Sequence, residues 1–259
     1  MADIAFLDRG RVMADRSFVV DGASVATASN RDPDHTYEEY VVWNLVVETP
    51  ERTILWDTGS HPDAGEGYWP EPLYDAFAHV DAAEHTLVGD LADAGYALAD
   101  IDAVVMSHLH LDHAGGLSEF AGTDVPIYVH REELPYAYYS ATTDEGSIAY
   151  LAADFDHDLN WSIVHGDSYH LAEGVELLHL PGHTPGLLGA LIERPGEPLL
   201  VVGDEAYVEA NYAGGPMATS LLSDTAAWRA SLARCRDIER RTGAEVLLGH
   251  DLSVFESVR

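Results

Sequence analysis

The sequence contains no lysine. Its 13 basic residues are all arginine and stand against 45 acidic residues, which gives a formal net charge of −32 at pH 7. A surface of this sign repels nucleic acid and anionic membranes, so neither is expected as a partner. An acid excess without lysine is typical of proteins adapted to molar salt, where the Debye length falls to about 3 Å. A GC-rich genome also favours arginine over lysine but does not explain the acid excess, and the composition therefore favours a halophilic source.

Cysteine is almost absent as well. Cys235 stands alone, which excludes an internal disulfide and a metal cluster built on thiolates. It falls in a helical pattern with Trp228, Leu232 and Ile238 at steps of three and four residues. We therefore interpret Cys235 as a small apolar packing residue.

Long apolar runs are missing too. No stretch approaches the roughly 18 consecutive apolar residues of a membrane span. The segment Met1–Arg9 lacks the basic region and apolar core of a secretory signal, so we expect a soluble, cytoplasmic protein. At 259 residues, with 47% hydrophobic content and no linker composition, residues 1–259 are expected to form a single α/β domain.

The chain is organised around the stretch from Ser107 to Gly116, which directly follows the apolar run 101–106, a predicted buried strand. Four of its side chains can bind a metal: His108, His110, Asp112 and His113. Residues two apart point to the same side of an extended segment, and the later pair can turn towards a second point. This spacing favours two adjacent metal ions. A surface loop rich in histidine is the weaker alternative, because a Gly-Gly turn follows the motif directly.

The pattern His-x-His-x-Asp-His after a strand resembles the signature of the metallo-β-lactamase superfamily of hydrolases. The resemblance implies an α/β fold, an αββα four-layer sandwich in which two mixed sheets pack face to face with helices outside. It also implies further ligands at three later strand ends, for which His183, Asp204 and His250 are the candidates. Each follows an apolar run and sits beside a glycine that lets the backbone turn sharply.

The ligand types indicate the chemistry. In the expected centre His108, His110 and His183 hold one ion, Asp112, His113 and His250 hold the other, and Asp204 bridges the two. Imidazole and carboxylate without thiolate suit Zn²⁺, although Fe, Mn or Co fit the same donors. Water that bridges two divalent ions loses a proton near neutral pH and becomes a hydroxide nucleophile.

Other residues near the expected centre have less specific interpretations. Asp57, at the end of a predicted strand, either braces the metal loop, as the resemblance implies, or forms a turn, and we leave it out of the ligand set. The segment 61–79 is expected to be a long ordered loop. Five further histidines lack a strand-end glycine and are interpreted as non-ligands: His130, His157, His165, His170 and His179. Strands are expected at 17–20, 40–47, 53–59, 125–130, 175–180, 187–192, 199–202 and 245–248, and helices at 81–94, 131–139 and 223–241.

Tyr207 carries the substrate prediction. It stands three residues after Asp204, and together with Gly-His-Asp around His250 it resembles the N-acyl homoserine lactone hydrolases, over nearly the whole chain. The resemblance implies opening of the ester ring of a small lactone, with Asp112 and Tyr207 as catalytic residues. The alternative for Tyr207 is an aromatic packing residue. Leu111 stands where relatives often carry a larger aromatic side chain, which indicates a roomier acyl pocket, and the oligomeric state stays open.

Three competing functions share the motif. The first is a glyoxalase II-like thioesterase or another ester hydrolase of the superfamily. The thioesterase needs a basic extension after the last ligand to hold its substrate, but only nine residues follow His250. A true β-lactamase is disfavoured because such enzymes place no bridging carboxylate at the position of Asp204. A non-catalytic metal-binding protein is disfavoured because structural zinc sites are closed, whereas two ions sharing seven ligands keep open positions.

Overall fold

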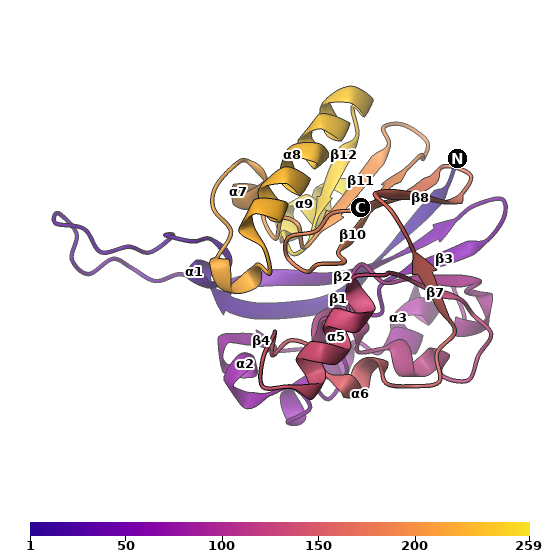
Figure 1. Ribbon diagram of the computed structural model, residues 1–259, viewed down its shortest axis with the longest axis horizontal. Helices are drawn as coiled ribbons and strands as arrows, with labels where there is room; N and C mark the ends of the chain where they lie inside the picture. Colours follow the sequence, from indigo (N-terminus) through magenta and orange to yellow (C-terminus); the bar gives the residue numbers. More distant parts are fainter.

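The computed structural model describes residues 1–259, and two β-sheets packed face to face form its centre (Figure 1). The strands of the larger sheet are β1 (Asp3–Asp15), β2 (Tyr37–Glu48), β3 (Thr53–Trp56), β4 (Phe77–His79), β5 (Ala103–Val105), β6 (Ile127–His130) and β7 (Trp161–Val164). The strands of the smaller sheet are β8 (Ser168–Ala172), β9 (Val175–His179), β10 (Leu188–Ile192), β11 (Leu199–Gly203) and β12 (Glu245–Leu248). Both sheets are mixed, so the expected sandwich of two mixed sheets is confirmed.

Strand order brings the candidate residues to shared edges. The larger sheet runs β4-β1-β2-β3-β5-β6-β7 and the smaller β12-β11-β10-β9-β8. Strands β3, β5, β6 and β7 are parallel, as are β11 and β12. The carboxyl ends of parallel neighbours lie at one edge of a sheet. Asp57 and Ser107 therefore emerge side by side after β3 and β5, and Asp204 and His250 do so after β11 and β12.

Helices cover both outer faces of the sheets (Figure 1). They are α1 (Arg16–Val19), α2 (Glu71–Ala76), α3 (Leu87–Asp93), α4 (Leu111–Ala114), α5 (Glu133–Thr142), α6 (Ala152–Phe155), α7 (Glu209–Tyr212), α8 (Thr225–Thr242) and α9 (Leu252–Val258). Helix α8 lies over the smaller sheet, while α3 and α5 lie against the larger one. None of these helices combines the length and the apolar composition that crossing a bilayer requires.

Three buried layers fill the space between these elements. Between the sheets, Trp43 and Trp56 of the larger sheet pack with Leu188 and Leu247 of the smaller one. A second layer lies beneath α8, and a third beneath α3 and α5. Apolar burial of this extent, worth about 25 cal/mol per Å², fixes both sheets as a rigid support for the loops at their edges.

Helix α8 illustrates how the sequence sets its own boundaries. The Asp224 carboxylate accepts hydrogen bonds from Ala226 N at 2.7 Å and Ala227 N at 3.0 Å, and Gly243 ends the helix with φ 69°. These are the start and stop signals of a capped helix. The expected helix over 223–241 is confirmed, and Cys235 is buried in the apolar layer beneath it, as predicted.

Two expectations for the N-terminal third are wrong. Residues 17–20 were expected as a strand, but Arg16–Val19 forms one helical turn, capped by Asp15, which accepts from Ser17 N at 2.7 Å. The loop expected over 61–79 contains α2 and β4, and β4 pairs with β1, where Met13 lies opposite Ala78. Strand β1 itself had no clear signal, because a bulge at Gly10 (φ 94°) interrupts its alternation.

Candidate metal centre

Seven buried side chains from four separate segments converge at the edge of the sandwich. They are His108, His110, Asp112, His113, His183, Asp204 and His250, the seven residues expected as ligands. Within this cluster three sets of donor atoms each lie within 4.8 Å of one another: His108 with His110 and His183, His108 with His113 and Asp204, and Asp112 with His113 and His250. The structure thus brings together donors that the sequence separates by up to about 140 positions.

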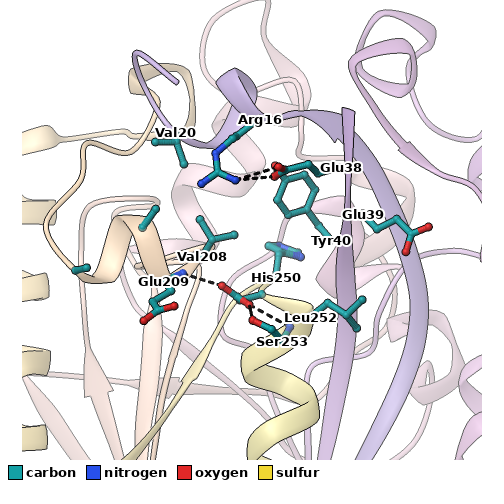
Figure 2. Close-up of a pocket in the computed structure, with 13 residues that line it drawn as sticks. Arg16, Val20, Glu38, Glu39, Tyr40, Val208, Glu209, His250, Leu252 and Ser253 are labelled. Carbon is teal, nitrogen blue, oxygen red and sulfur yellow. Dashed lines mark hydrogen bonds and ion pairs between the residues drawn. The ribbon is translucent and has the colours of Figure 1, made fainter. Parts of the chain in front are cut away.

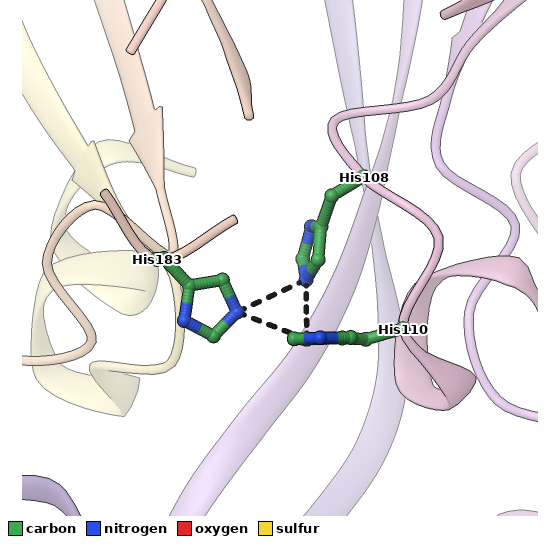
Figure 3. Close-up of side chains that lie close together, drawn as sticks. All are labelled: His108, His110 and His183. Atoms are coloured by element: carbon green, nitrogen blue, oxygen red, sulfur yellow. Dashed lines mark hydrogen bonds between the residues drawn. The ribbon is translucent and has the colours of Figure 1, made fainter. Parts of the chain in front are cut away.

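His108, His110 and His183 form the first group, which we call the triple-histidine group (Figure 3). His183 Nε2 lies 3.0 Å from His110 Nδ1 and 3.3 Å from His108 Nε2, and the latter two atoms are 3.1 Å apart. Three ring nitrogens that face one point cannot all be satisfied by one another, because each pair needs one donor and one acceptor. A cation between them satisfies all three lone pairs.

Asp112, His113 and His250 form the second group, and Asp204 lies between the two. Asp112 Oδ2 is 3.6 Å from His113 Nε2 and 3.5 Å from His250 Nε2. Asp204 Oδ2 is 3.5 Å from both His113 Nε2 and His183 Nε2 and 3.4 Å from His250 Nε2. A single carboxylate oxygen therefore faces donors of both groups, the position that a bridging ligand requires.

Several of these donors have no partner within the protein. Asp112 Oδ2, His113 Nε2 and Asp204 Oδ1 are buried without a hydrogen bond. Each unsatisfied polar group in a protein interior costs about 1–3 kcal/mol. Because nitrogen and oxygen donors without sulfur suit Zn²⁺ and similar divalent ions, the cluster fits a pair of cations, and this part of the chain is a His/Asp metal-binding site.

The charge states differ between the two donor groups. Burial alone would lower the pKa of His113 and His250, but the Asp204 and Asp112 carboxylates raise it. These two rings therefore give up a proton when a cation binds.

The triple-histidine group is already in the form that binds metal. Burial, and next the neighbouring imidazoles, lower the pKa of His108 and His110 well below the usual value, so both rings are neutral with a free lone pair. Burial alone would raise the pKa of Asp204, but the imidazoles of His250 and His113 hold it well below its usual value. Neutral imidazole and ionised carboxylate are the forms that ligate cations.

Hydrogen bonds on the far side of the rings fix their orientation. His183 Nδ1 lies 2.6 Å from Leu221 O, and His250 Nδ1 lies 2.9 Å from Val41 O. A carbonyl oxygen can only accept, so Nδ1 carries the proton in both rings. Nε2 is then the lone-pair nitrogen, and it is the atom that faces the cluster.

Asp57 acts both as a turn residue and as a brace for the metal loop, the two alternatives considered from the sequence. It has φ 57°, a left-handed turn conformation that is uncommon outside glycine. From there Oδ1 accepts from Ser107 N at 2.6 Å, and Oδ2 contacts Ser107 Oγ at 2.7 Å and His113 Nδ1 at 2.9 Å. The residue turns the chain and holds the metal loop, and it lies outside the three donor sets.

A cavity of about 540 Å³ opens onto the cluster. Its polar lining includes His110, Asp112, His183 and Tyr207, and its apolar lining includes Phe18, Leu73, Phe77, Leu111, Ile148 and Leu222. Leu111 therefore borders the cavity, as expected from the sequence. The lining combines metal donors with apolar side chains, which suits a small ligand with a polar head and an apolar tail.

Tyr207 lies where this cavity meets the cluster. Its ring centroid is 4.5 Å from that of His250 and 5.5 Å from that of His183. Burial, and next the Asp204 and Asp112 carboxylates, raise the pKa of the phenol well above its usual value. The hydroxyl therefore keeps its proton at neutral pH and can donate a hydrogen bond.

A second cavity, of about 470 Å³, has His250 in its lining (Figure 2). Three of its charged side chains have partners within the protein. Arg16 Nη1 is 2.9 Å from Glu38 Oε1, and the Asp251 carboxylate accepts from Glu209 N at 2.8 Å and from Ser253 N at 3.1 Å. It contains only one of the seven candidate ligands, so the first cavity is the better candidate for a substrate.

The remaining histidines lie outside the donor sets. His130 and His179 stack with ring centroids 3.6 Å apart, and His157 Nε2 bonds to Ala153 O at 2.8 Å. Sequence reasoning missed Glu133, whose buried carboxylate contacts segments on both sides of the triple-histidine group. It stood in a predicted helix beside Glu132, and no local pattern distinguished the two residues.

Comparison with known proteins gives a consistent picture. The family model of the Metallo-beta-lactamase superfamily matches residues 37–250. The chain is 29% identical to N-acyl homoserine lactonase AiiB of Agrobacterium fabrum, over 97% of this chain and 94% of that protein. It is 32% identical to an N-acyl homoserine lactonase of a Bacillus species, over 95% of this chain and 92% of that protein.

A solved structure extends the likeness to three dimensions. It is an N-acyl homoserine lactone hydrolase with the product N-hexanoyl-L-homoserine bound at its catalytic metal centre. It is 30% identical in sequence and aligns with a TM-score of 0.82, over 99% of this chain and 96% of that chain.

Proposed function

Because the chain belongs to the metallo-beta-lactamase superfamily, we propose that it is a metal-dependent hydrolase that opens the ester ring of lactones. N-acyl homoserine lactones are the proposed substrates, since the curated relatives over 95% and more of the chain are lactonases of that class. The observation that carries the proposal is the cavity that joins both donor groups and Tyr207 to an apolar wall.

The ions are assigned from the donor sets. His108, His110 and His183 would hold one ion, Asp112, His113 and His250 the other, and Asp204 would contact both. Two bound divalent ions acidify water near neutral pH and polarise an ester carbonyl. We expect Zn²⁺ from the donor types, while Fe, Mn or Co suit them as well.

Two side chains of this protein act on the substrate in the proposed reaction. The Tyr207 hydroxyl, kept protonated by its surroundings, donates to the carbonyl oxygen as negative charge develops on it. Asp112 contacts His113 and His250 through Oδ2, which leaves Oδ1 to receive the proton of the attacking water. As the bond between the acyl carbon and the ring oxygen breaks, Asp112 passes this proton to that oxygen, and the product is the open N-acyl homoserine.

The apolar wall gives the acyl chain its place. Phe18, Leu73, Phe77 and Ile148 belong to the apolar lining of the cavity. Each methylene group buried against such a surface contributes about 0.8 kcal/mol. An acyl tail packed against these side chains therefore adds affinity while the lactone ring contacts the metal donors. Leu111 leaves more room for the tail than a larger aromatic side chain would at that position.

A substrate panel tests the function directly. The metal-loaded protein is assayed in molar KCl with an N-acyl homoserine lactone, an open-chain ester and a thioester. We expect the lactone to have the highest kcat/KM and to yield the ring-opened acid. A preference for the thioester would favour the glyoxalase II-like alternative, and turnover of none of the three would favour the non-catalytic alternative.

We also infer three properties of the whole chain. Residues 1–259 form one domain, which is supported by a core layer that includes strands from near both ends of the chain. A halophilic source is supported by the net charge of −32 without lysine. The cytoplasmic location stays a prediction, and the oligomeric state stays open.

A further inference from the structure

Glu133, at the start of α5, is a buried carboxylate with four hydrogen-bond partners. Its exposed fraction is 0%. Oε1 accepts from Leu109 N at 3.0 Å and from the Tyr150 hydroxyl at 2.8 Å. Oε2 accepts from the Thr184 hydroxyl at 2.7 Å and from Gly186 N at 3.2 Å. No arginine or histidine pairs with it, so these four donors alone compensate its burial.

Three of the four donors come from segments that carry the triple-histidine group. Leu109 lies between His108 and His110, and Thr184 directly follows His183. One carboxylate oxygen thus holds the segment with the first two rings, and the other oxygen holds the segment with the third. Figure 3 shows these rings approaching one another from opposite sides.

Tyr150 extends the contact to the ring of His110. Its ring centroid is 4.5 Å from that of His110 at an interplanar angle of 62°, and its hydroxyl is bound to Glu133. The neighbouring residue Ala149 accepts from Leu111 N at 2.9 Å. Glu133 therefore fixes the packing that orients the His110 ring as well as the backbone beside it.

The approach of the His183 segment to α5 depends on a residue without a side chain. A Cβ atom at Gly186 would lie 2.3 Å from Glu133 N and 2.6 Å from Glu133 Cα, closer than any real contact. The segment can reach the Glu133 carboxylate only because glycine occupies this position.

In the second donor group, His113 is held by a different buried carboxylate, that of Asp57. Asp57 contacts Ser107 and His113, whereas the hydrogen bonds of Glu133 include none to Asp112, His113, Asp204 or His250. Asp57 also reaches His108, because the Ser107 hydroxyl lies 3.0 Å from His108 Nδ1, but of the two carboxylates only Glu133 binds the His183 segment.

We propose that Glu133 is a positioning residue that sets the separation between the His108–His110 segment and the His183 segment, and so the metal affinity of the triple-histidine group. It touches neither the ion nor the substrate. The inference rests on the proposed function in that these three histidines hold an ion. Outer contacts of metal ligands typically contribute about 10–100-fold in affinity, and Glu133 concentrates four such contacts in one side chain.

The test is Glu133→Gln, which keeps the size of the side chain. The amide NH₂ of glutamine takes the place of one carboxylate oxygen. It cannot accept a hydrogen bond from Leu109 N or from Gly186 N, which can only donate, so one backbone contact is lost. Zn²⁺ affinity is measured by competition with a chelator. We expect one of the two ions to bind about 10–100-fold more weakly than in the wild-type protein, and the other to be unchanged.

The matched control is Glu132→Gln, which removes the same charge from the adjacent position. Glu132 is exposed and pairs with Arg131 at 2.9 Å, away from the ligand segments. We expect it to leave both affinities unchanged. Cadmium NMR of the two variants identifies which ion is affected, and the signal of the nitrogen-rich triple-histidine group should be the one that changes.

Thr184→Val gives an independent variant, because it removes one donor and leaves the carboxylate in place. It should weaken the same ion, and it carries the test if Glu133→Gln does not fold. A wild-type protein that binds fewer than two ions would contradict the proposed function. If the wild-type protein binds two, then unchanged affinity in the folded variants, or an equal loss of both ions, would contradict the role of Glu133 alone.

Discussion

A substitution at Tyr207 tests lactone hydrolysis without changing a metal ligand. Tyr207→Phe deletes one hydroxyl and keeps the ring packed beside His183 and His250. We expect kcat/KM on N-acyl homoserine lactones to fall by about ten- to a thousandfold, since a donor to a developing oxyanion is worth roughly 1.4–4 kcal/mol. Metal content should not change. Wild-type activity in this variant would show that Tyr207 only packs against the imidazoles.

Asp154 provides a prediction about pH. It is buried in α6, where Oδ1 accepts from the Tyr68 hydroxyl at 2.7 Å and Oδ2 has no partner. Burial raises the pKa of Asp154 from 3.8 to about 7. Between these values the folded state binds more protons than the unfolded state. The contribution of Asp154 to the free energy of unfolding is therefore complete below about pH 4 and is lost as the pH rises to about 7.

Asp154→Asn removes this titration and keeps an oxygen for Tyr68. We expect the variant to be more stable than the wild-type protein at pH 8, with the difference shrinking by up to about 1.4 kcal/mol per pH unit as the pH falls towards 4. Urea unfolding of both proteins over this range is the measurement. A constant difference between them would mean that Asp154 titrates normally in the folded protein.

For single residues, functions that depend on neighbours in the sequence could be predicted, whereas functions that depend on distant residues were missed. His108, His110, Asp112 and His113 stand together in one motif, so their common purpose could be inferred without a structure. Glu133 meets its partners only after folding, because they come from residues 17 and more positions away on both sides. A single sequence contains no signal for contacts of that kind.

Secondary-structure elements were predictable where their boundaries are set by their own residues. Helix α8 begins at a capping aspartate and ends at a glycine, and both signals are visible in the sequence. Strand β4 pairs with β1 across more than 60 residues, and β1, which pairs with β2 along most of its length, carries a bulge. Such strands follow from tertiary contacts, which override weak local propensity.

The turn between β9 and β10 carries a prediction about its shape. In Gly186→Ala the new Cβ atom collides with the backbone of Glu133, and overpacking of this kind costs about 1–3 kcal/mol. The turn must move away from α5, so we expect weaker Zn²⁺ binding as well as lower stability.

Gly122→Ala is the control. It meets no atom within 4 Å but is strained by φ +71°, so it should lose about 1–2 kcal/mol of stability and keep its Zn²⁺ affinity. Equal Zn²⁺ affinity in both variants would contradict the role of the close approach.

The whole molecule is dominated by its charge. The 13 arginines can neutralise at most 13 of the 45 acidic residues, which leaves a net charge of −32. Mutual repulsion of this charge opposes the compact state and is screened by salt. We expect the free energy of unfolding and the activity to rise from dilute buffer to molar KCl. A rise of about 3 kcal/mol in the free energy of unfolding would increase Tm by roughly 5–10 °C. The same Tm at both salt concentrations would mean that the acidic composition is not an adaptation to salt.

The most direct test of a dinuclear lactonase is a zinc titration in which activity is measured at each step. Metal-free protein in molar KCl receives Zn²⁺ in steps, and the opening of an N-acyl homoserine lactone is measured after each step, with Asp204→Asn as the variant that lacks the shared carboxylate. We predict that activity rises until about two ions are bound per chain and that Asp204→Asn gains neither the second ion nor the activity. Full activity in the metal-free protein, or none when two ions are bound, would contradict a reaction at this centre.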